Sequence, residues 1–231
     1  MAKDSVNEMS FLDHLEELRW HIIKAIGAVV LFAFIAFLIK GFIFDVIIFG
    51  PKQMSFPTYK WLCKVSQFIN IDTTFCGSEF PFVIQNRTMA GQFSAHIWTS
   101  IAAGFILAFP YVIYQIWSFI SPGLHSSERR YSKGFIFSAS LLFFLGVLFG
   151  YYIVIPLSIN FLANYNISAE ISNEVDLTSY IALVRSSSLA SGLVFELPIL
   201  IYFLTKVRLV TPKILKKYRK FALVIVLIFS D

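Results

Sequence analysis

Long apolar stretches separated by short polar segments dominate the chain. All but the last are long enough for a membrane-spanning helix, whereas the last would cover only about 15 Å as a helix. The first contains one charge, Lys24, near its beginning, where a lysine side chain can extend to the membrane interface. The stretches are residues 22–39, 88–127, 134–169, 177–205 and 221–230.

Composition agrees with this pattern. The 231 residues are 57% hydrophobic and 14% charged, with a mean hydropathy of +0.72, whereas soluble domains carry about 25% charged residues. Residues 1–19 are acidic on balance, unlike a cleavable secretory signal. We therefore predict an all-α, polytopic membrane protein whose single membrane domain occupies residues 1–231 with about five spans. Prolines inside the spans, Pro110, Pro156 and Pro198, are expected to curve them.

Basic residues predict the orientation. Residues 121–133 and 206–220 carry a surplus of lysine and arginine, whereas the segment between the third and fourth stretches contains acids and no base. The positive-inside rule then places the N-terminus and both basic loops in the cytoplasm, and residues 41–92 in an outward loop. Cys63 and Cys76 lie in that loop, where an oxidising compartment would favour a disulfide.

The segment SFLDHLEELRWHIIK begins with Ser10 and Asp13 in a capping-box-like pattern, which predicts an N-terminal cytoplasmic helix over residues 10–19. At 100° per residue, one side of this helix is an apolar stripe that includes Arg19. We expect the opposite side to face water, with Glu17 available to a cytoplasmic ligand; a merely solvated acid is the alternative. The stripe consists of Leu12, Leu15, Leu18, Ile22 and Ile26, and the polar side of Asp13, Glu17 and His21.

A second motif, WSFISPGLHSSERR, follows the second apolar stretch. Pro122 and Gly123 are expected to end the preceding helix, since the residue before a proline is pushed towards extended geometry. Glu128 would then begin the next helix, near the positive end of its dipole. The alternatives for Glu128 are a role as this dipole partner alone, or an ion pair with Arg129 or Arg130.

A carboxylic acid, Glu196, interrupts the fourth stretch within GLVFELP. Along a helix, the nearest charges, Arg185 and Lys206, would each lie roughly 15 Å away. An acid at this depth costs about 2.5–3.5 kcal/mol on insertion scales and is expected to face protein or water. Glu196 is therefore a candidate for contact with a partner helix, or for a hydrogen bond within the same protein.

Taken together, HLEELR, FPYVIYQIWSFISPGLHSSERR, FLGVLFGYYIVIPLSINFL and GLVFELP resemble the TatC family over nearly the whole chain, in order and in spacing. TatC is the multispanning signal-peptide receptor subunit of the twin-arginine protein translocase. The resemblance implies a curved helical bundle with six spans, of which this chain shows about five, in the bacterial cytoplasmic (inner) membrane. It also implies export of folded proteins driven by the proton gradient, without a cofactor.

The resemblance assigns a binding surface for signal peptides that carry two consecutive arginines. Glu17 and Glu128 would bind the arginines, while Arg19, Phe119 and Pro122 would shape the surface around them. The chemistry is suitable, because a guanidinium group pairs with a carboxylate through two parallel hydrogen bonds, whereas a lysine is a point charge.

The resemblance assigns two further positions. Glu196 would contact the small single-span subunits of TatA or TatB type, in a complex that also contains further copies of this chain. Pro51, in the FGPK that follows the first span, would be a structural proline. His125 and Ser126 stand where relatives commonly have Tyr and Lys, so contacts there are expected to differ.

Two other classes of function compete with this one. A proton-coupled carrier of small molecules or ions could use Glu196, but it would need a second polar partner in the core, for which His96 is the candidate in spans two and three. An intramembrane enzyme would need a catalytic constellation, and the sequence contains no GxSxG, HExxH or pair of intramembrane aspartates. We therefore predict a non-enzymatic receptor and scaffold that contacts peptides, protein subunits and lipid, without a metal or nucleic acid.

Overall fold

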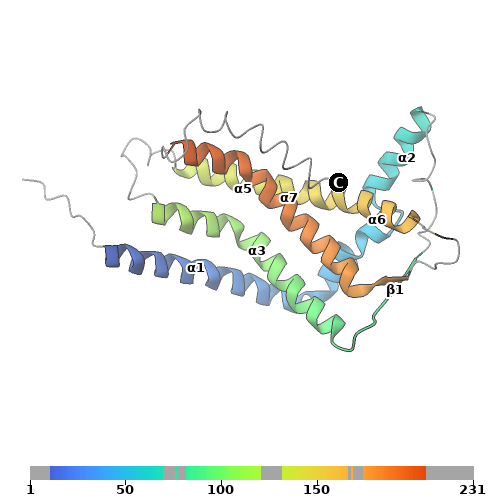
Figure 1. Cartoon of the computed structure of the whole chain (residues 1–231), viewed down its shortest axis with the longest axis horizontal. Helices are drawn as coiled ribbons and strands as arrows, with labels where there is room; N and C mark the ends of the chain where they lie inside the picture. The colour runs from blue at the N-terminus through green and yellow to red at the C-terminus, as the bar shows by residue number, and fades with distance from the viewer. Residues whose placement is uncertain are drawn as a thin grey trace, which may run out of the picture.

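Four long helices lie side by side in the computed structural model, and shorter elements gather at one end of them (Figure 1). The structure describes residues 11–69, 76, 82–120, 132–165, 168 and 174–206. Helix α1 packs against α3, α5 packs against α7, and α3 also contacts both α5 and α7. The long helices are α1 (Phe11–Leu38), α3 (Gly91–Ile120), α5 (Ser132–Phe149) and α7 (Leu177–Lys206).

Four of the five predicted spans are present in the described part of the chain. Each is long and apolar enough to cross a membrane, and the fifth stretch, 221–230, lies outside the described residues. The third span is not one regular helix, because α5 continues through a π-helical turn, η5 (Gly150–Val154), into α6 (Ile155–Asn164). The spans are Leu15–Leu38, Gly91–Ile120, Gly134–Asn164 and Leu177–Tyr202.

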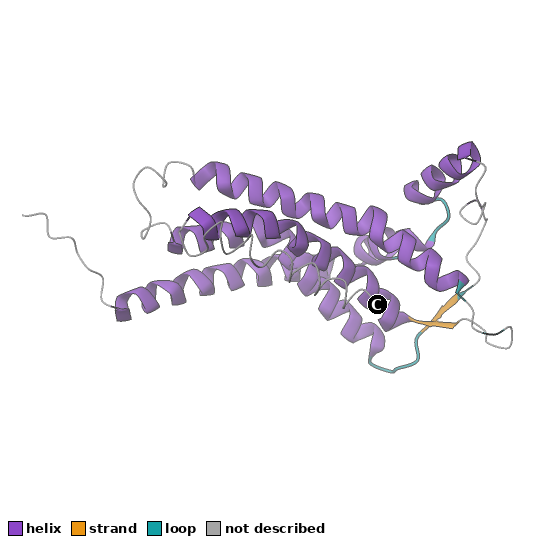
Figure 2. Cartoon of the chain, turned by 45° about the horizontal axis from the view of Figure 1, so that its top comes forward, coloured by secondary structure: helices purple, strands orange, loops and turns teal. Residues whose placement is uncertain are grey.

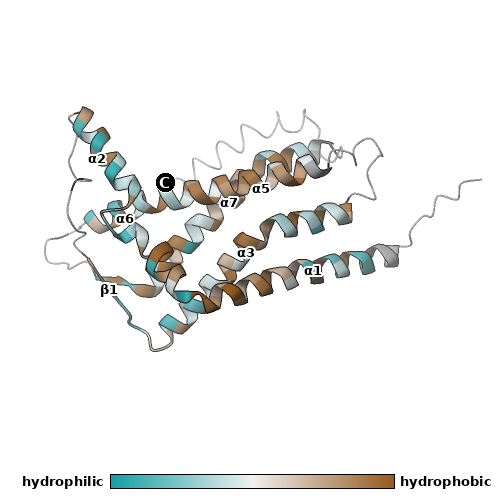
Figure 3. Cartoon of the chain, turned by 180° about the vertical axis from the view of Figure 1, so that it is seen from behind, coloured by the Kyte–Doolittle hydropathy of each residue, from teal (hydrophilic) through white to brown (hydrophobic). Residues whose placement is uncertain are grey.

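The outer surfaces of the spans are apolar. Figure 3 shows hydrophobic residues along most of α1, where Val30, Leu31 and Phe34 are each more than half exposed. Such a surface is a liability in water, but acyl chains solvate it in a bilayer. The predicted N-terminal helix over residues 10–19 is not separate from this span, since residues 11–19 form the beginning of α1.

The predicted outward loop, residues 41–92, contains regular structure. A π-helix and a 3₁₀ turn follow α1 directly, and a helix then projects away from the bundle (Figure 1). One short strand from this segment pairs in parallel with another that precedes α7 (Figure 2). These elements are η1 (Phe42–Ile48), η2 (Gly50–Lys52), α2 (Pro57–Ile69), β1 (Val83–Gln85) and β2 (Glu174–Asp176).

The strand pair connects the outward segment to the start of α7. Beside the pair, Arg87 Nη2 lies 2.8 Å from Glu174 Oε2. Asp176 then caps α7, because its carboxylate accepts hydrogen bonds from the side chain and the backbone N–H of Thr178. The side-chain hydrogen bond from Thr178 is the main cause that lowers the pKa of Asp176 below its ordinary value.

Three tyrosine hydroxyl groups close the end of the bundle where η1, η2 and α2 lie, and we call them the tyrosine cap. Tyr59 Oη lies 3.0 Å from the carbonyl oxygen of Pro51 and 3.1 Å from that of Pro156. Tyr151 and Tyr180 donate to the last two carbonyl groups of η1. Irregular and terminal turns leave carbonyl groups without intrahelical partners, and these hydroxyls supply them. Pro51 is fully buried in this cap, and burial raises the pKa of Tyr59 above its ordinary value, so the phenol remains a hydrogen-bond donor.

A disulfide bond joins Cys63 and Cys76, whose Cα atoms are 5.1 Å apart. The bridge connects α2 to the chain that leads to β1, and this is the disulfide that the sequence predicted. Closing a loop of this length is worth about 3 kcal/mol in the chain-entropy model.

Small residues allow the spans to approach closely. A Cβ atom placed on Gly104 of α3 would lie 2.5 Å from the backbone nitrogen of Ala33 in α1. Cβ atoms on Gly146 and Gly150 would lie 2.7 Å and 2.8 Å from oxygen atoms of Ser191 in α7. Small residues four positions apart permit this backbone contact, which contributes to helix association where lipid removes the hydrophobic driving force.

Replacing Gly150 by alanine should therefore separate α7 from the third span. We expect overpacking to cost about 1–3 kcal/mol and to lower the midpoint of thermal unfolding in detergent by several degrees, on the order of 5 °C. Gly134→Ala is the matched control, since nothing lies within 4 Å of a Cβ atom at that position. Equal shifts for the two variants would contradict the packing argument.

Candidate functional site

The first turns of α1 carry candidate binding residues at the end of the bundle opposite the tyrosine cap (Figure 1). Glu17 is half-buried and Arg19 is exposed. The C-terminus of α3 and the N-terminus of α5 lie at this same end (Figure 1). Glu128 and Pro122, which fall between those two helices in the sequence, lie outside the described residues.

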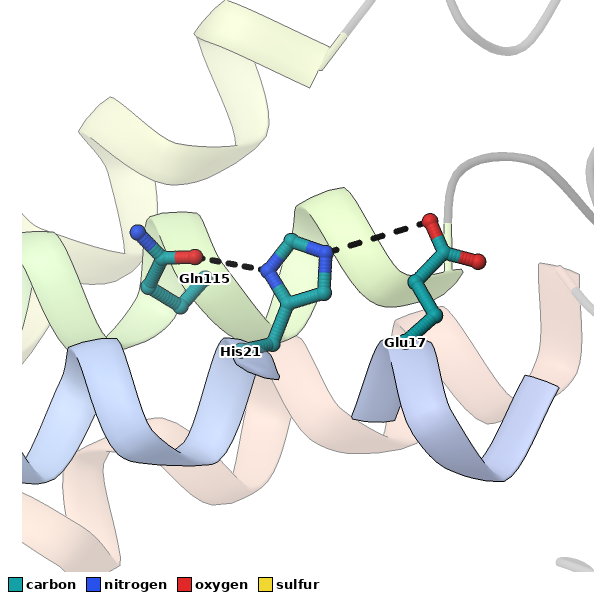
Figure 4. Close-up of polar contacts among 3 residues, drawn as sticks. All are labelled: Glu17, His21 and Gln115. Atoms are coloured by element: carbon teal, nitrogen blue, oxygen red, sulfur yellow. Dashed lines mark hydrogen bonds and ion pairs between the residues drawn. The ribbon is translucent and has the colours of Figure 1, made fainter. Parts of the chain in front are cut away.

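A polar chain joins Glu17 to the interior of the bundle (Figure 4). Gln115 of α3 is buried, and its Oε1 lies 2.6 Å from His21 Nδ1. Because an amide oxygen only accepts, this contact places the hydrogen on Nδ1 of the imidazole. The other ring nitrogen, Nε2, lies 4.0 Å from Glu17 Oε1. Glu17 therefore faces a histidine whose ring orientation is set by a neighbouring helix.

The protonation of His21 decides what Nε2 offers to a ligand at Glu17. In the neutral ring Nε2 is an acceptor, whereas in the imidazolium it is a donor. With the neutral ring, Glu17 Oε1 and His21 Nε2 form two acceptors side by side. A guanidinium group, which has only donors in a planar fork, is complementary to such a pair.

The predicted side of α1 for His21 is wrong. The sequence pattern placed His21 on a water-facing side, opposite the apolar stripe, but the His21 side chain is only 16% exposed and contacts α3. The stripe faces outward instead, with Leu15, Ile22 and Ile26 exposed. The reason is the solvent: in lipid, an apolar stripe can face the acyl chains, so the polar side meets the protein.

Phe119 lies next to this polar chain. Its ring centroid is 6.4 Å from that of His21, in a tilted arrangement. The structure thus brings Phe119 of α3 and His21 of α1 together, one helical turn along α1 from Glu17. Arg19 lies on the exposed side of α1 with the apolar stripe, and no ion pair between Glu17 and Arg19 is present.

Glu196 lies in the fourth span, inside α7. Its side chain is half-buried, and Oε1 is buried without a hydrogen-bond partner among the described residues. Its neighbours Leu193 and Leu197 are both 50% exposed. Buried polar atoms in native proteins almost always have a hydrogen-bond partner, so we expect a donor from another molecule to contact this oxygen.

Arg185 lies on the same side of α7 as Glu196. The two are eleven residues apart, which is close to three full turns and about 16 Å along the axis. The side chain of Arg185 is half-buried, and no hydrogen bond or ion pair joins it to another described residue. The two side chains are therefore too far apart to form an ion pair with each other.

No cluster of histidine, cysteine or carboxylate side chains within the described ranges could bind a metal ion.

Sequence reasoning missed one residue of the site, Gln115. A polar residue within an otherwise apolar span is a signal that could have found it, because such residues usually face the bundle interior.

Comparison with known proteins agrees with this architecture. The family model described as Sec-independent protein translocase protein (TatC) matches residues 13–231. The Sec-independent protein translocase protein TatC of Blattabacterium sp. subsp. Periplaneta americana (strain BPLAN) is 44% identical over 230 residues, 99% of this chain and 86% of that protein. The TatC of Aquifex aeolicus (strain VF5) is 32% identical over 223 residues, 96% of this chain and 83% of that one.

Solved structures extend the match to three dimensions. A crystal structure of the twin arginine translocase receptor TatC superposes with a TM-score of 0.70 at 31% identity, covering 92% of this chain and 83% of that chain. A second, determined in the detergent DDM, gives 0.71 at 32% identity. The predicted helical membrane fold is thus confirmed, and the chain belongs to the TatC family of Sec-independent protein translocases.

Proposed function

We propose that this chain is the signal-peptide receptor and scaffold of a twin-arginine translocase in a bacterial cytoplasmic membrane, with its N-terminus in the cytoplasm. Glu17 and Glu128 bind the paired arginines of the signal peptide, and Arg19, Phe119 and Pro122 shape the surrounding surface. Glu196 contacts small single-span subunits of the TatA or TatB type. Several copies of the chain assemble in the same complex.

One observation carries the peptide-binding part of this proposal. The Glu17 carboxylate is half-buried, and the side chain it faces is His21 rather than the nearby Arg19. A resident arginine would neutralise the carboxylate and compete with a ligand. When its ring is neutral, His21 leaves the negative charge available and adds an acceptor beside it.

The energetics require more than one contact. An exposed ion pair contributes only about 0–1 kcal/mol, because both partners are well solvated and side-chain entropy is lost. Partial burial beside His21 and Phe119 strengthens hydrogen bonds to Glu17, since the local dielectric is lower than in water. A second carboxylate, Glu128, then makes the spacing of two arginines part of recognition.

We expect Glu17→Gln to weaken the binding of a twin-arginine signal peptide by about tenfold, because a charge-assisted hydrogen bond becomes a neutral one. Binding of a twin-lysine version should change much less, since lysine does not pair bidentately. Fluorescence anisotropy of a labelled peptide with detergent-solubilised protein measures both. Glu16→Gln, at an exposed acid one residue earlier, is the control. Equal losses for both peptides would reject arginine-specific pairing.

Glu128→Gln should have the same effect, and the two substitutions should couple. If one peptide touches both carboxylates, the loss of binding free energy in the double variant should be smaller than the sum of the losses in the two single variants. The difference should be about 0.5 kcal/mol or more. Strict additivity, measured with the same peptide, would mean that the two acids act on separate events.

Gln115→Leu tests the role of His21 as a positioning residue. The substitution leaves the ring without its partner on Nδ1, so Glu17 loses a fixed acceptor beside it. We expect the ratio of twin-arginine to twin-lysine affinity to fall by about two- to fivefold, corresponding to a hydrogen bond of typical strength. A lower thermal stability with an unchanged ratio would assign Gln115 to structure alone.

For Glu196 we expect Glu196→Ala to reduce co-purification of the single-span subunits severalfold while signal-peptide affinity stays unchanged. The buried oxygen of Glu196 without a described partner supports this division of roles. Leu197→Ala, which also shortens an exposed side chain on α7, is the matched control. If Glu196→Ala lost peptide binding and kept subunit assembly, the role proposed for Glu196 would be wrong.

A further inference from the structure

An open cavity of about 1390 Å³ lies at the tyrosine-cap end of the bundle. Its wall includes Phe44 of η1, beyond the end of the first span, His96 near the start of α3, and Ile181 near the start of α7. Lys52 of η2 and Phe82 before β1 complete its rim. None of the functional residues proposed above lines it.

The ends of the spans indicate the depth of this cavity in a bilayer. The apolar part of α1 ends at Leu38, and the second and fourth spans begin at Gly91 and Leu177. Residues that line the cavity lie just beyond the end of the first span or at the starts of the second and fourth spans. The cavity therefore lies where the hydrocarbon region meets water. In a bilayer, phosphate groups occupy this level.

The charges that line the cavity are two lysines and one acid, Lys40, Lys52 and Asp45. No ion pair joins either lysine to another described residue. Lys52 Nζ lies 5.8 Å from the ring centroid of Phe82, a cation–π contact that keeps the ammonium group at the rim. The cavity therefore carries a positive surplus with uncompensated donors.

Polar, aliphatic and aromatic side chains make up the rest of the lining, and its aromatic members are Phe44, Phe49, Phe82, Phe93 and His96. Phe93 lines the cavity and is 64% exposed. Phe42, the first residue of η1, lies outside the lining and is 59% exposed. His96 is fixed in the wall, since its ring stacks on Phe37 at 4.0 Å and its Nε2 lies 3.2 Å from the Phe37 carbonyl oxygen. A ligand complementary to such a surface is an amphipathic anion.

We propose that this cavity binds the headgroup of an anionic phospholipid. Its phosphate accepts hydrogen bonds from Lys40 and Lys52, and its acyl chains lie along the exposed aromatic side chains beside Phe93. A zwitterionic lipid would leave the positive surplus unmatched, and a free inorganic anion would leave the aromatic surface unused. The proposal does not depend on signal-peptide binding or on Glu196.

The test uses the purified full chain in detergent with phosphatidylglycerol and phosphatidylcholine of identical acyl chains, and native mass spectrometry of the retained lipid. We expect a preference for phosphatidylglycerol of about tenfold. The double variant Lys40→Gln/Lys52→Gln should lose about five- to thirtyfold in phosphatidylglycerol affinity, with phosphatidylcholine unchanged. Lys60→Gln/Lys64→Gln, on exposed α2 residues outside the cavity, removes the same charge at the same end and should have little effect.

Asp45→Asn distinguishes an effect on lipid binding from a loss of folding. It removes the acid of the cavity, so phosphatidylglycerol affinity should rise severalfold, a gain that unfolding cannot produce. No headgroup preference in the unchanged protein, or equal losses in both lysine double variants, would overturn the proposal. It is also overturned if Lys40→Gln/Lys52→Gln leaves lipid binding intact but abolishes co-purification of another protein, because the cavity then binds an acidic protein segment.

Discussion

Lipid as the solvent is the constraint on which the structure depends. Acyl chains solvate a leucine as well as another protein side chain does, so the spans gain little by turning apolar stripes inward. Helix α1 follows this rule, with its most apolar residues exposed and its contacts with α3 made where Gly104 meets Ala33. Close backbone approach and hydrogen bonds between helices, such as that from His21 to Gln115, then hold the bundle together.

The same constraint explains the tyrosine cap. Backbone carbonyl groups without partners are expensive near the hydrocarbon region, so irregular backbone persists only where side chains supply hydrogen bonds. The chain is irregular at η1, at η2 and where η5 passes into α6 beside Pro156, and tyrosine hydroxyls donate to carbonyl groups at each of these places. These contacts fix η1, η2 and α2 against the ends of the spans, and the Cys63–Cys76 disulfide ties α2 to the chain that follows it.

Features that depend on local composition could be predicted from the sequence, whereas features that depend on contacts between distant segments could not. The hydropathy pattern predicted the four spans that the described part of the chain contains, and the location of the cysteines predicted the disulfide. Helical periodicity separated the two sides of α1 correctly but assigned the wrong surroundings to them, because it assumed water as the solvent. The Gln115 contact spans 94 positions in the sequence and the β1–β2 pair joins strands of three residues, so neither produces a periodic signal.

Two glutamates with the same chemical group illustrate how the surroundings divide proposed roles. Glu17 lies near the end of a span, beside a histidine and within reach of water, so its carboxylate can remain charged and attract a cation. Glu196 lies between exposed leucines within a span, where a charge is expensive and a hydrogen bond to a polar group is favourable. Exchanging the surroundings would exchange the chemistry, so the positions of these acids, rather than their identity, determine which proposed partner each one binds.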